Sequence, residues 1–316
     1  MESAYPTKEI IQDAAKRIAP FVHHTPVLTS LSINEMFGIN LFLKCENFQK
    51  IGAFKYRGAT NAVLTLTAEE KKNGVATHSS GNHAQALALA AKINGLKAYI
   101  VMPENSSSVK INAVRGYGAE VILCAPNQKA REDTLADVIK KTGATLIHPY
   151  NNYSIIAGQA TAAKELIEEI KDLDIVMAPV GGGGLLSGTA LSTHYFSPKS
   201  LVIAGEPLNA DDAYRSLKEG VLLPSNPPST IADGLLTSLG DKTFDIIRKH
   251  VKEIVLVSEE EIIAAMRLVW ERMKIIIEPS SAVPIAAAIK SKDRFRGKRI
   301  GIIISGGNVD LGKSPF

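Results

Sequence analysis

The sequence predicts an α/β fold with a mostly parallel sheet that carries helices on both faces. Short β-rich runs alternate with longer helical patterns along the chain, an order typical of βαβ units. The run Ile300–Ile304 is apolar throughout, as a strand buried on both faces should be. The chain has 316 residues, a length that corresponds to about two domains.

The predicted strands and helices alternate along the chain. The runs predicted to form strands are, in order, Leu41–Glu46, Val75–His78, Ala98–Met102, Glu120–Cys124, Thr145–His148, Asp174–Val180, Leu201–Glu206 and Arg299–Ser305. The helical segments between them include Asn82–Asn94, Gln128–Lys141, Gly158–Lys171, Leu185–Tyr195 and Glu259–Met273. Glycine-rich turns follow several of the strands, and open α/β sheets place their ligands at such turns.

Composition excludes several classes of protein. The apolar fraction is 45% and the charged fraction 22%, which is typical of soluble globular chains and excludes disorder and collagen-like structure. The net charge is only +4, without a basic block, so nucleic-acid binding is not indicated. The sequence has no apolar run of ~18 residues, so no membrane span is predicted. The two cysteines, Cys45 and Cys124, indicate reduced thiols in a cytoplasmic protein.

The strongest local signal is the glycine turn Gly181-Gly182-Gly183-Gly184, which lies between a predicted strand and a helix. Glycine N–H groups and a helix N-terminus favour a bound phosphate. A merely tight turn is the alternative, but four glycines are entropically costly there. A Walker A loop is excluded because no Lys-Ser/Thr follows. The spacing of the glycines also differs from the GxGxxG motif of dinucleotide-binding folds. Dinucleotide binding stays an alternative, however, because Glu206 lies about 20 residues further on, where an acid that binds the ribose is expected.

Two further segments have chemistry-bearing residues. The turn Ser79-Ser80-Gly81-Asn82-His83 follows a strand, and its hydroxyls and N–H groups could hold a carboxylate; a plain helix N-cap by Ser80 or Asn82 is the alternative. Taken singly, His78 and His83 are interpreted as structural. Lys55 lies among apolar and aromatic residues, where desolvation would leave a neutral amine able to form a Schiff base. The alternative is a lysine that extends to the surface.

Together these segments resemble the fold-type-II pyridoxal-phosphate enzymes, and within them the serine racemase and serine/threonine dehydratase group. The resemblance covers nearly the whole chain. It is carried by Thr25–Leu28, Glu46, Ala53-Phe54-Lys55, Ser79–His83, Gly181–Leu185, Ile231–Gly234, Trp270–Met273 and Ser305-Gly306-Gly307-Asn308.

The resemblance implies a tryptophan-synthase-β-like architecture, with two open twisted α/β domains and the cofactor in the cleft between them. Residues 1–73 and 153–316 would form the large, cofactor-binding domain. Residues 74–152 would form a small mobile domain that closes over the substrate. A homodimer is expected from the family.

The resemblance also implies a role for each motif. Lys55 would form the Schiff base with pyridoxal 5'-phosphate, and Phe54 would lie against the ring. Asn82 would bond to the ring hydroxyl, and Ser305 would face the pyridine nitrogen. The phosphate would be held by Gly181, Gly182, Gly183, Gly184 and Leu185. The substrate carboxylate would be held by Ser79, Ser80, Gly81, Asn82 and His83. Lys55 and Ser80 would act as the two catalytic bases on opposite faces.

A divalent cation is expected beside the next strand. By resemblance its ligands are the carboxylates of Glu206 and Asp212 and the backbone carbonyl of Ala210. Oxygen ligands of this kind suit Mg²⁺, Mn²⁺ or Ca²⁺, and a solvated acidic loop is the alternative. Ile51 replaces a threonine of the nucleotide site in mammalian racemases of this group, so ATP activation is not expected.

The resemblance implies a serine racemase that also converts L-serine to pyruvate and ammonia by β-elimination. The first alternative is a dehydratase for L-threonine or L-threo-3-hydroxyaspartate with little racemisation. Ala53 is shared with relatives active on 3-hydroxyaspartate, and Arg131 could reach a β-carboxylate, although a solvated helix face is the alternative there. A more remote alternative is a nucleotide-binding protein without catalysis. All three interpretations require a small-molecule partner.

Overall fold

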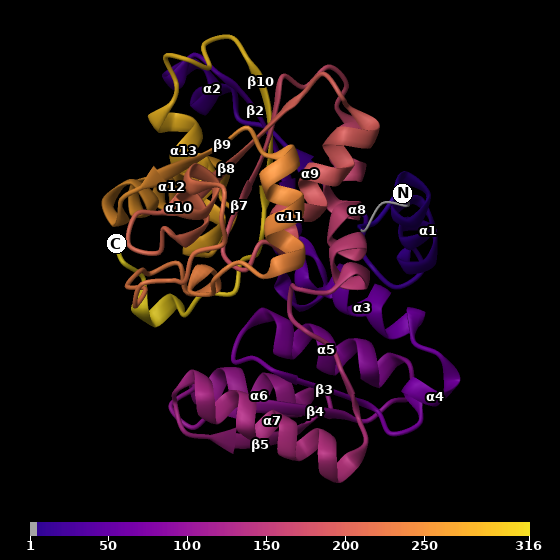
Figure 1. Ribbon diagram of the computed structural model, residues 1–316. Coiled ribbons are helices and arrows are strands. Elements are labelled where there is room, and N and C mark those ends of the chain that lie inside the picture. The colour runs from indigo at the N-terminus through magenta and orange to yellow at the C-terminus, as the bar shows by residue number, and fades with distance from the viewer. Residues whose placement is uncertain (1–4) are drawn as a thin grey trace.

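The computed structural model describes residues 5–316, and most of the chain is built around one large sheet (Figure 1). This sheet has six strands in the order β1-β2-β10-β7-β8-β9. Its strands are β1 (Val27–Leu28), β2 (Asn40–Cys45), β7 (Ile175–Pro179), β8 (Leu201–Pro207), β9 (Glu253–Val257) and β10 (Arg299–Ile304). All neighbours pair in parallel except β1 and β2, so the predicted α/β fold is confirmed.

A second, smaller sheet lies below the first in Figure 1. Its four strands run in the order β5-β4-β3-β6, and all of them pair in parallel. They are β3 (Val75–His78), β4 (Ala98–Pro103), β5 (Glu120–Cys124) and β6 (Thr145–Leu146).

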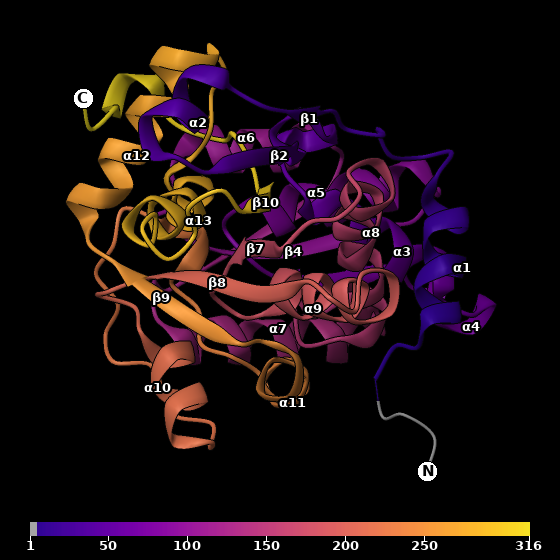
Figure 2. The same ribbon diagram turned by 90° about the horizontal axis from the view of Figure 1, so that it is seen from above.

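Helices cover both faces of the large sheet. Side chains that alternate along β10 belong to two different cores, because successive residues of a strand point to opposite faces. Ile302 packs in the core with α12 (Glu259–Met273) and α13 (Pro279–Lys290), whereas Ile303 packs with α8 (Tyr153–Glu169) and α9 (Gly184–Phe196). Figure 2 shows α13 and α9 on opposite sides of β8. The apolar run Ile300–Ile304 is therefore buried on both faces, as predicted.

The small sheet is covered in the same way. Val75 and Ile100 pack against residues of α3 (Lys55–Thr65) and α5 (Asn82–Ile93), and Ala76 and Val101 pack against α7 (Gln128–Thr142). Helix α3 also packs on α8, so it connects the two sheets. The remaining helices are α1 (Lys8–Ile18), α2 (Leu31–Phe37), α4 (Ala68–Lys71), α6 (Ser108–Gly116), α10 (Asp212–Glu219) and α11 (Asp241–His250), with 3₁₀ turns η1 (Glu46–Phe48), η2 (Lys50–Gly52), η3 (Asp233–Leu235) and η4 (Leu311–Lys313).

Several predicted boundaries differ from the structure. Helix α8 begins at Tyr153 instead of Gly158, because the Asn152 side chain accepts hydrogen bonds from the first turn and caps the helix there. Strand β6 ends at Leu146, two residues before the predicted end. Strands β1 and β9 were not predicted. Within residues 5–316, no helix combines the length and hydropathy needed to cross a membrane.

A buried set of charges fixes the start of α3. The Arg57 guanidinium donates to Glu46 Oε2 and to Glu165 Oε1, each at 2.7 Å. The Lys44 amine donates to Glu165 Oε2 at 2.7 Å. Lys44, Glu46 and Arg57 are fully buried, and the set joins β2, α3 and α8. It therefore anchors the helix whose first residue is Lys55.

Candidate active site

The predicted site segments all follow the carboxyl ends of parallel strands, the edge where such sheets bind ligands. Ala53-Phe54-Lys55 follows β2, Ser79–His83 follows β3, Gly181–Leu185 follows β7 and Ser305 follows β10. Two of these segments contact each other directly. The Phe54 N–H donates to the Ser305 carbonyl at 2.9 Å, and Ala53 forms an isolated β-bridge with Gly306.

Lys55 begins α3 and directs its amine inward. The amine donates to the Pro149 carbonyl at 3.0 Å and lies 5.3 Å from the centroid of the Phe54 ring. Burial lowers the pKa of Lys55 to about 8, and the negative charge of Glu278 opposes that shift. The amine does not extend to the surface, and a substantial fraction of it is neutral near physiological pH.

The Ser79–His83 turn is not a plain helix cap. The N-cap of α5 is Gly81, and no side chain caps that helix. The Gly81 N–H donates to the Ser79 hydroxyl at 3.3 Å, whereas the Ser80 hydroxyl has no partner among residues 5–316. His83 is buried and bonds through Nε2 to the Ile147 carbonyl at 3.3 Å, and its Nδ1 is buried without a partner. The alternative of a cap by Ser80 or Asn82 is therefore wrong.

Asn82 is held by Glu278, which the sequence analysis did not identify, and by Asn308, which belongs to one of the quoted motifs. Its Nδ2 donates to both carboxylate oxygens of Glu278, at 3.2 and 3.1 Å. Its Oδ1 accepts from Asn308 Nδ2 at 2.9 Å. Burial raises the pKa of Glu278 to about 7, and the negative charge of Asp233 adds to this shift. Glu278 lies 196 residues from Asn82 and follows no recognisable motif, so only the fold reveals it.

The glycine turn is a buried cradle of N–H groups. The amides of Gly181, Gly182 and Gly183 donate to no residue of the described chain, although the turn itself is buried. Buried N–H groups without a partner are rare, and they suit an anion at the N-terminus of α9. A Cβ at Gly182 would overlap the ring of Tyr150, and Gly183 has a φ of +84°. Side chains are therefore excluded on steric as well as conformational grounds.

Ser305 lies in a neutral hydrogen-bonded pair. Its hydroxyl is 2.9 Å from the Ser281 hydroxyl, and Ser281 in turn accepts from the Gly306 N–H at 2.7 Å. Both serines are buried. Ser281 is a second residue that sequence reasoning missed, because it belongs to the mostly apolar helix α13 and to no recognisable motif.

The predicted cation ligands lie where β8 leads into α10. Glu206 is 1% and Asp212 2% exposed, so the alternative of a solvated acidic loop is wrong for both. Glu206 accepts the N–H groups of Ala213 at 2.9 Å and Tyr214 at 2.7 Å, and Asp212 accepts that of Leu239 at 3.0 Å.

Neither carboxylate forms an ion pair within the described residues, although the positive charge of Arg215 acts on Asp212. Burial raises the pKa of Glu206 to about 9 and that of Asp212 to about 6. Ala210 is also buried. Across the described part of the chain, no three His, Cys, Asp or Glu side chains gather as a metal-binding group; the predicted set has two such side chains.

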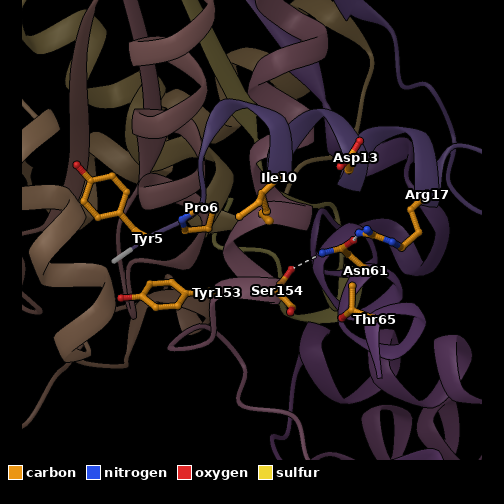
Figure 3. A pocket seen from close by; sticks show the side chains of 10 residues that line it. Tyr5, Pro6, Ile10, Asp13, Arg17, Asn61, Thr65, Tyr153 and Ser154 are labelled. Carbon is orange, nitrogen blue, oxygen red and sulfur yellow. Dashed lines mark hydrogen bonds between the residues drawn. The ribbon is translucent and has the colours of Figure 1, made fainter. Parts of the chain in front are cut away.

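A separate pocket of about 340 Å³ lies between α1, α3 and α8 (Figure 3). Arg17 Nη1 donates to Asn61 Oδ1 at 2.7 Å, and Asn61 Nδ2 donates to the Ser154 carbonyl at 2.7 Å. These polar groups satisfy one another, and no predicted site residue lines the pocket. The predicted site residues therefore lie outside this pocket.

Known proteins match this chain over nearly its whole length. A family model described as pyridoxal-phosphate dependent enzyme matches residues 18–306. The chain is 53% identical to a serine racemase of Dictyostelium discoideum, over 96% of this chain and 95% of that one. It is 49% identical to a beta-hydroxyaspartate dehydratase of Paracoccus denitrificans, over 98% and 99%.

Solved structures give the same picture. The crystal structure of the Dictyostelium discoideum serine racemase superposes with a TM-score of 0.93 at 52% identity, over 96% of this chain and 99% of that one. The crystal structure of a maize serine racemase superposes with a TM-score of 0.95 at 43% identity, over 98% and 95%.

Proposed function

Because this chain belongs to the family of pyridoxal-phosphate dependent enzymes, we propose that it is a serine racemase that also converts L-serine to pyruvate and ammonia. Relatives named serine racemase match nearly its full length at 45–53% identity. The observation that carries the proposal is the Lys55 amine, which faces inward, has a lowered pKa and acts through its charge on His83 of the Ser79–His83 turn.

The residues of the site fit pyridoxal phosphate. Three buried N–H groups without a partner at Gly181–Gly183 suit its phosphate. The inward amine of Lys55 suits covalent attachment, and the neutral Ser305–Ser281 pair suits a pyridine nitrogen that stays unprotonated. When bound, the cofactor withdraws electrons from the α-carbon of an amino acid and makes its α-proton acidic.

The chain's own residues then decide the outcome. The Ser79–His83 turn binds the substrate carboxylate through its N–H groups and hydroxyls. The Lys55 amine takes the α-proton from one face, and the Ser80 hydroxyl returns a proton to the other. If the β-hydroxyl departs before that return, the product hydrolyses to pyruvate and ammonia. Racemisation and elimination therefore compete in one site.

The test is to incubate the enzyme with L-serine and to measure D-serine and pyruvate together. Borohydride treatment should attach the cofactor to Lys55, and Lys55→Ala should abolish both products. Ser80→Ala should lower D-serine formation by about 100-fold and should retain elimination from L-serine. Lys50→Ala, a nearby lysine outside the site, is the matched control. Cofactor-loaded enzyme that yields neither product would refute the proposal.

A dehydratase for L-threo-3-hydroxyaspartate is a second candidate, and one side chain favours it. Arg131 Nε is buried without a hydrogen-bond partner, and the positive charge of Arg131 adds to the burial that lowers the pKa of His78, at the end of β3. This supports the proposal that the guanidinium reaches the Ser79–His83 turn, where it would bind a second carboxylate. A kcat/KM for hydroxyaspartate far above that for serine would select this candidate, and Arg131→Leu should lower only the former.

A divalent cation at Glu206, Asp212 and the Ala210 carbonyl completes the proposal. Two buried carboxylates that form no ion pair within the described residues support it, since a cation would compensate both charges. Calorimetric titration with MgCl₂ or CaCl₂ tests it, and Asp212→Asn should weaken the binding.

The remaining expectations concern organisation. We propose a large domain of residues 1–73 and 153–316 and a small mobile domain of residues 74–152; the second sheet, whose strands all lie within the latter range, supports this division. The protein would act as a cytoplasmic homodimer without ATP activation. Light scattering during gel filtration tests the dimer, and activity with and without ATP tests the last point.

A further inference from the structure

We propose that His148 binds the side-chain hydroxyl of the substrate through its Nε2–H group and thereby promotes departure of that hydroxyl. This inference rests on the proposed function, because it assigns a residue to the β-elimination branch of the same site. His148 belongs to none of the motifs that define the site, and its place in the fold brings it there.

The register of the small sheet places His148 beside the carboxylate-binding turn. Strands β3 and β6 pair Val75 with Thr145 and Ala76 with Leu146. The ladder continues past β6, because the Ile147 N–H donates to the Ala76 carbonyl at 2.9 Å. One residue further along, His148 lies next to His78, the residue that leads into Ser79–His83.

The other neighbour of His148 is the Lys55 amine. That amine donates to the carbonyl of Pro149, the residue directly after His148. The imidazole therefore stands close to both proposed functional groups: the base that removes the α-proton and the turn that holds the carboxylate. A substrate held between them would present its β-carbon in this region.

Hydrogen bonds fix the tautomer of His148. Its Nδ1 accepts the N–H of Asn151 at 2.9 Å and that of Tyr150 at 3.3 Å. The ring proton is consequently on Nε2. The Tyr150 ring meets the imidazole edge to face, at 4.6 Å between centroids and 89° between planes. No residue of the described chain accepts from Nε2.

The surroundings keep this donor neutral. Burial lowers the pKa of His148 to about 4, and the positive charges of His78, Lys55 and Lys242 add to the effect, whereas Asp241 opposes it. A neutral imidazole N–H is an effective electrophile in a site that excludes charge. It would donate a hydrogen bond without competing with Lys55 for protons.

The donor acts on one branch only. In elimination the electron pair of the Cβ–O bond goes to the oxygen, which accumulates negative charge that a hydrogen bond stabilises. The departing oxygen takes up the proton that Lys55 removed from the α-carbon, so the balance is one molecule of water. In racemisation the Cβ–O bond stays intact, and the same hydrogen bond contributes only to binding.

The variant His148→Asn tests this assignment, because a short asparagine side chain can still accept the N–H groups two and three residues ahead while withdrawing the donor from the cleft. Pyruvate formation from L-serine should fall by about 100-fold. The kcat for D-serine formation should be nearly unchanged, although its KM should rise because the hydrogen bond contributes to binding. Elimination from L-serine O-sulfate should also be nearly unchanged, because sulfate leaves without help from a donor.

Equal losses with L-serine and L-serine O-sulfate would overturn the assignment, as would unchanged pyruvate formation from L-serine. His78→Asn is the matched control on the neighbouring strand, and the same selective loss there would also overturn it. If the unsubstituted enzyme makes neither D-serine nor pyruvate, the proposed function itself fails; if it makes both and His148→Asn is silent, only the role of His148 fails.

A second measurement does not depend on turnover. Nitrogen chemical shifts of the His148 ring in the cofactor-loaded protein should show a single proton, on Nε2, from about pH 6 to about pH 8. A proton on Nδ1, or a doubly protonated ring in that range, would overturn the proposal.

Discussion

Replacing Glu206 by Gln should flatten the dependence of stability on pH when divalent cations are absent. Burial raises the pKa of the Glu206 carboxyl to about 9, from 4.5 in its unperturbed form. Between pH 6 and 8 the folded protein therefore holds a proton that the unfolded chain has released. Because the unfolded state binds fewer protons, the free energy of unfolding falls as the pH rises through this window.

The magnitude follows from one proton over two pH units. Each unit contributes about 1.4 kcal/mol, so the wild-type protein should lose about 3 kcal/mol more than the variant between pH 6 and 8. Asp212 and Glu278 also have raised pKa values, but they are present in both proteins. The difference between the pH dependence of the wild-type protein and that of Glu206→Gln therefore measures the contribution of Glu206 alone, whatever the absolute stability of the variant.

The assay is urea unfolding in the presence of a chelator, at pH 6 and pH 8, for both proteins. Equal losses of unfolding free energy in the two proteins would refute the argument that Glu206 is a buried, uncompensated carboxyl. Added Mg²⁺ should reverse the loss at pH 8, and its affinity should rise by up to about tenfold per pH unit, because binding requires the ionised carboxylate.

Three further predictions concern the frame around the site. Arg57→Met should lower the unfolding free energy by about 3–5 kcal/mol in urea titrations, because it leaves the buried Glu46 carboxylate without its positive partner and Glu165 with Lys44 alone. Gly182→Ala should weaken pyridoxal-phosphate binding to the cofactor-free protein by about tenfold, equivalent to about 1.4 kcal/mol, since the new methyl displaces the Tyr150 ring; Tyr150→Ala should restore binding in a fluorescence titration. Ser281→Ala should lower stability to heat by about 1 kcal/mol, because Ser305 and a buried amide lose their partner; an unchanged melting temperature would contradict this.

Local patterns predicted the parts of the site that are continuous in sequence. The turn Gly181–Gly184 was recognised from its consecutive glycines, which leave backbone N–H groups free to approach an anion. Lys55 was recognised from its apolar and aromatic neighbours, which desolvate its amine. Strands such as Val75–His78 were predicted from the same local signals, and their bounds agree with the structure. The mostly parallel arrangement followed from the alternation of strands and helices.

Contacts between distant segments leave no such local pattern. Glu278 reaches Asn82 across 196 residues, and Pro149 reaches Lys55 across 94. Neither interaction can be recognised from the residue type alone. Glu278 acts through a carboxylate at a helix cap, and Pro149 acts through a backbone carbonyl, which every residue has. The tautomer of His148 is likewise fixed by the N–H groups of Tyr150 and Asn151. The pairing of β3 with β6 determines which residues lie beside it.

The set of Lys44, Glu46, Arg57 and Glu165 has a consequence for the history of the protein. Two positive and two negative side chains are paired with one another. A mutation that removes one of these charges leaves its partner unpaired in the interior. A second mutation that removes a charge of the opposite sign restores neutrality. The amino acids at these four positions should therefore vary together among related proteins. A relative that lacks Arg57 should also lack the acidic residue at the position of Glu46 or of Glu165.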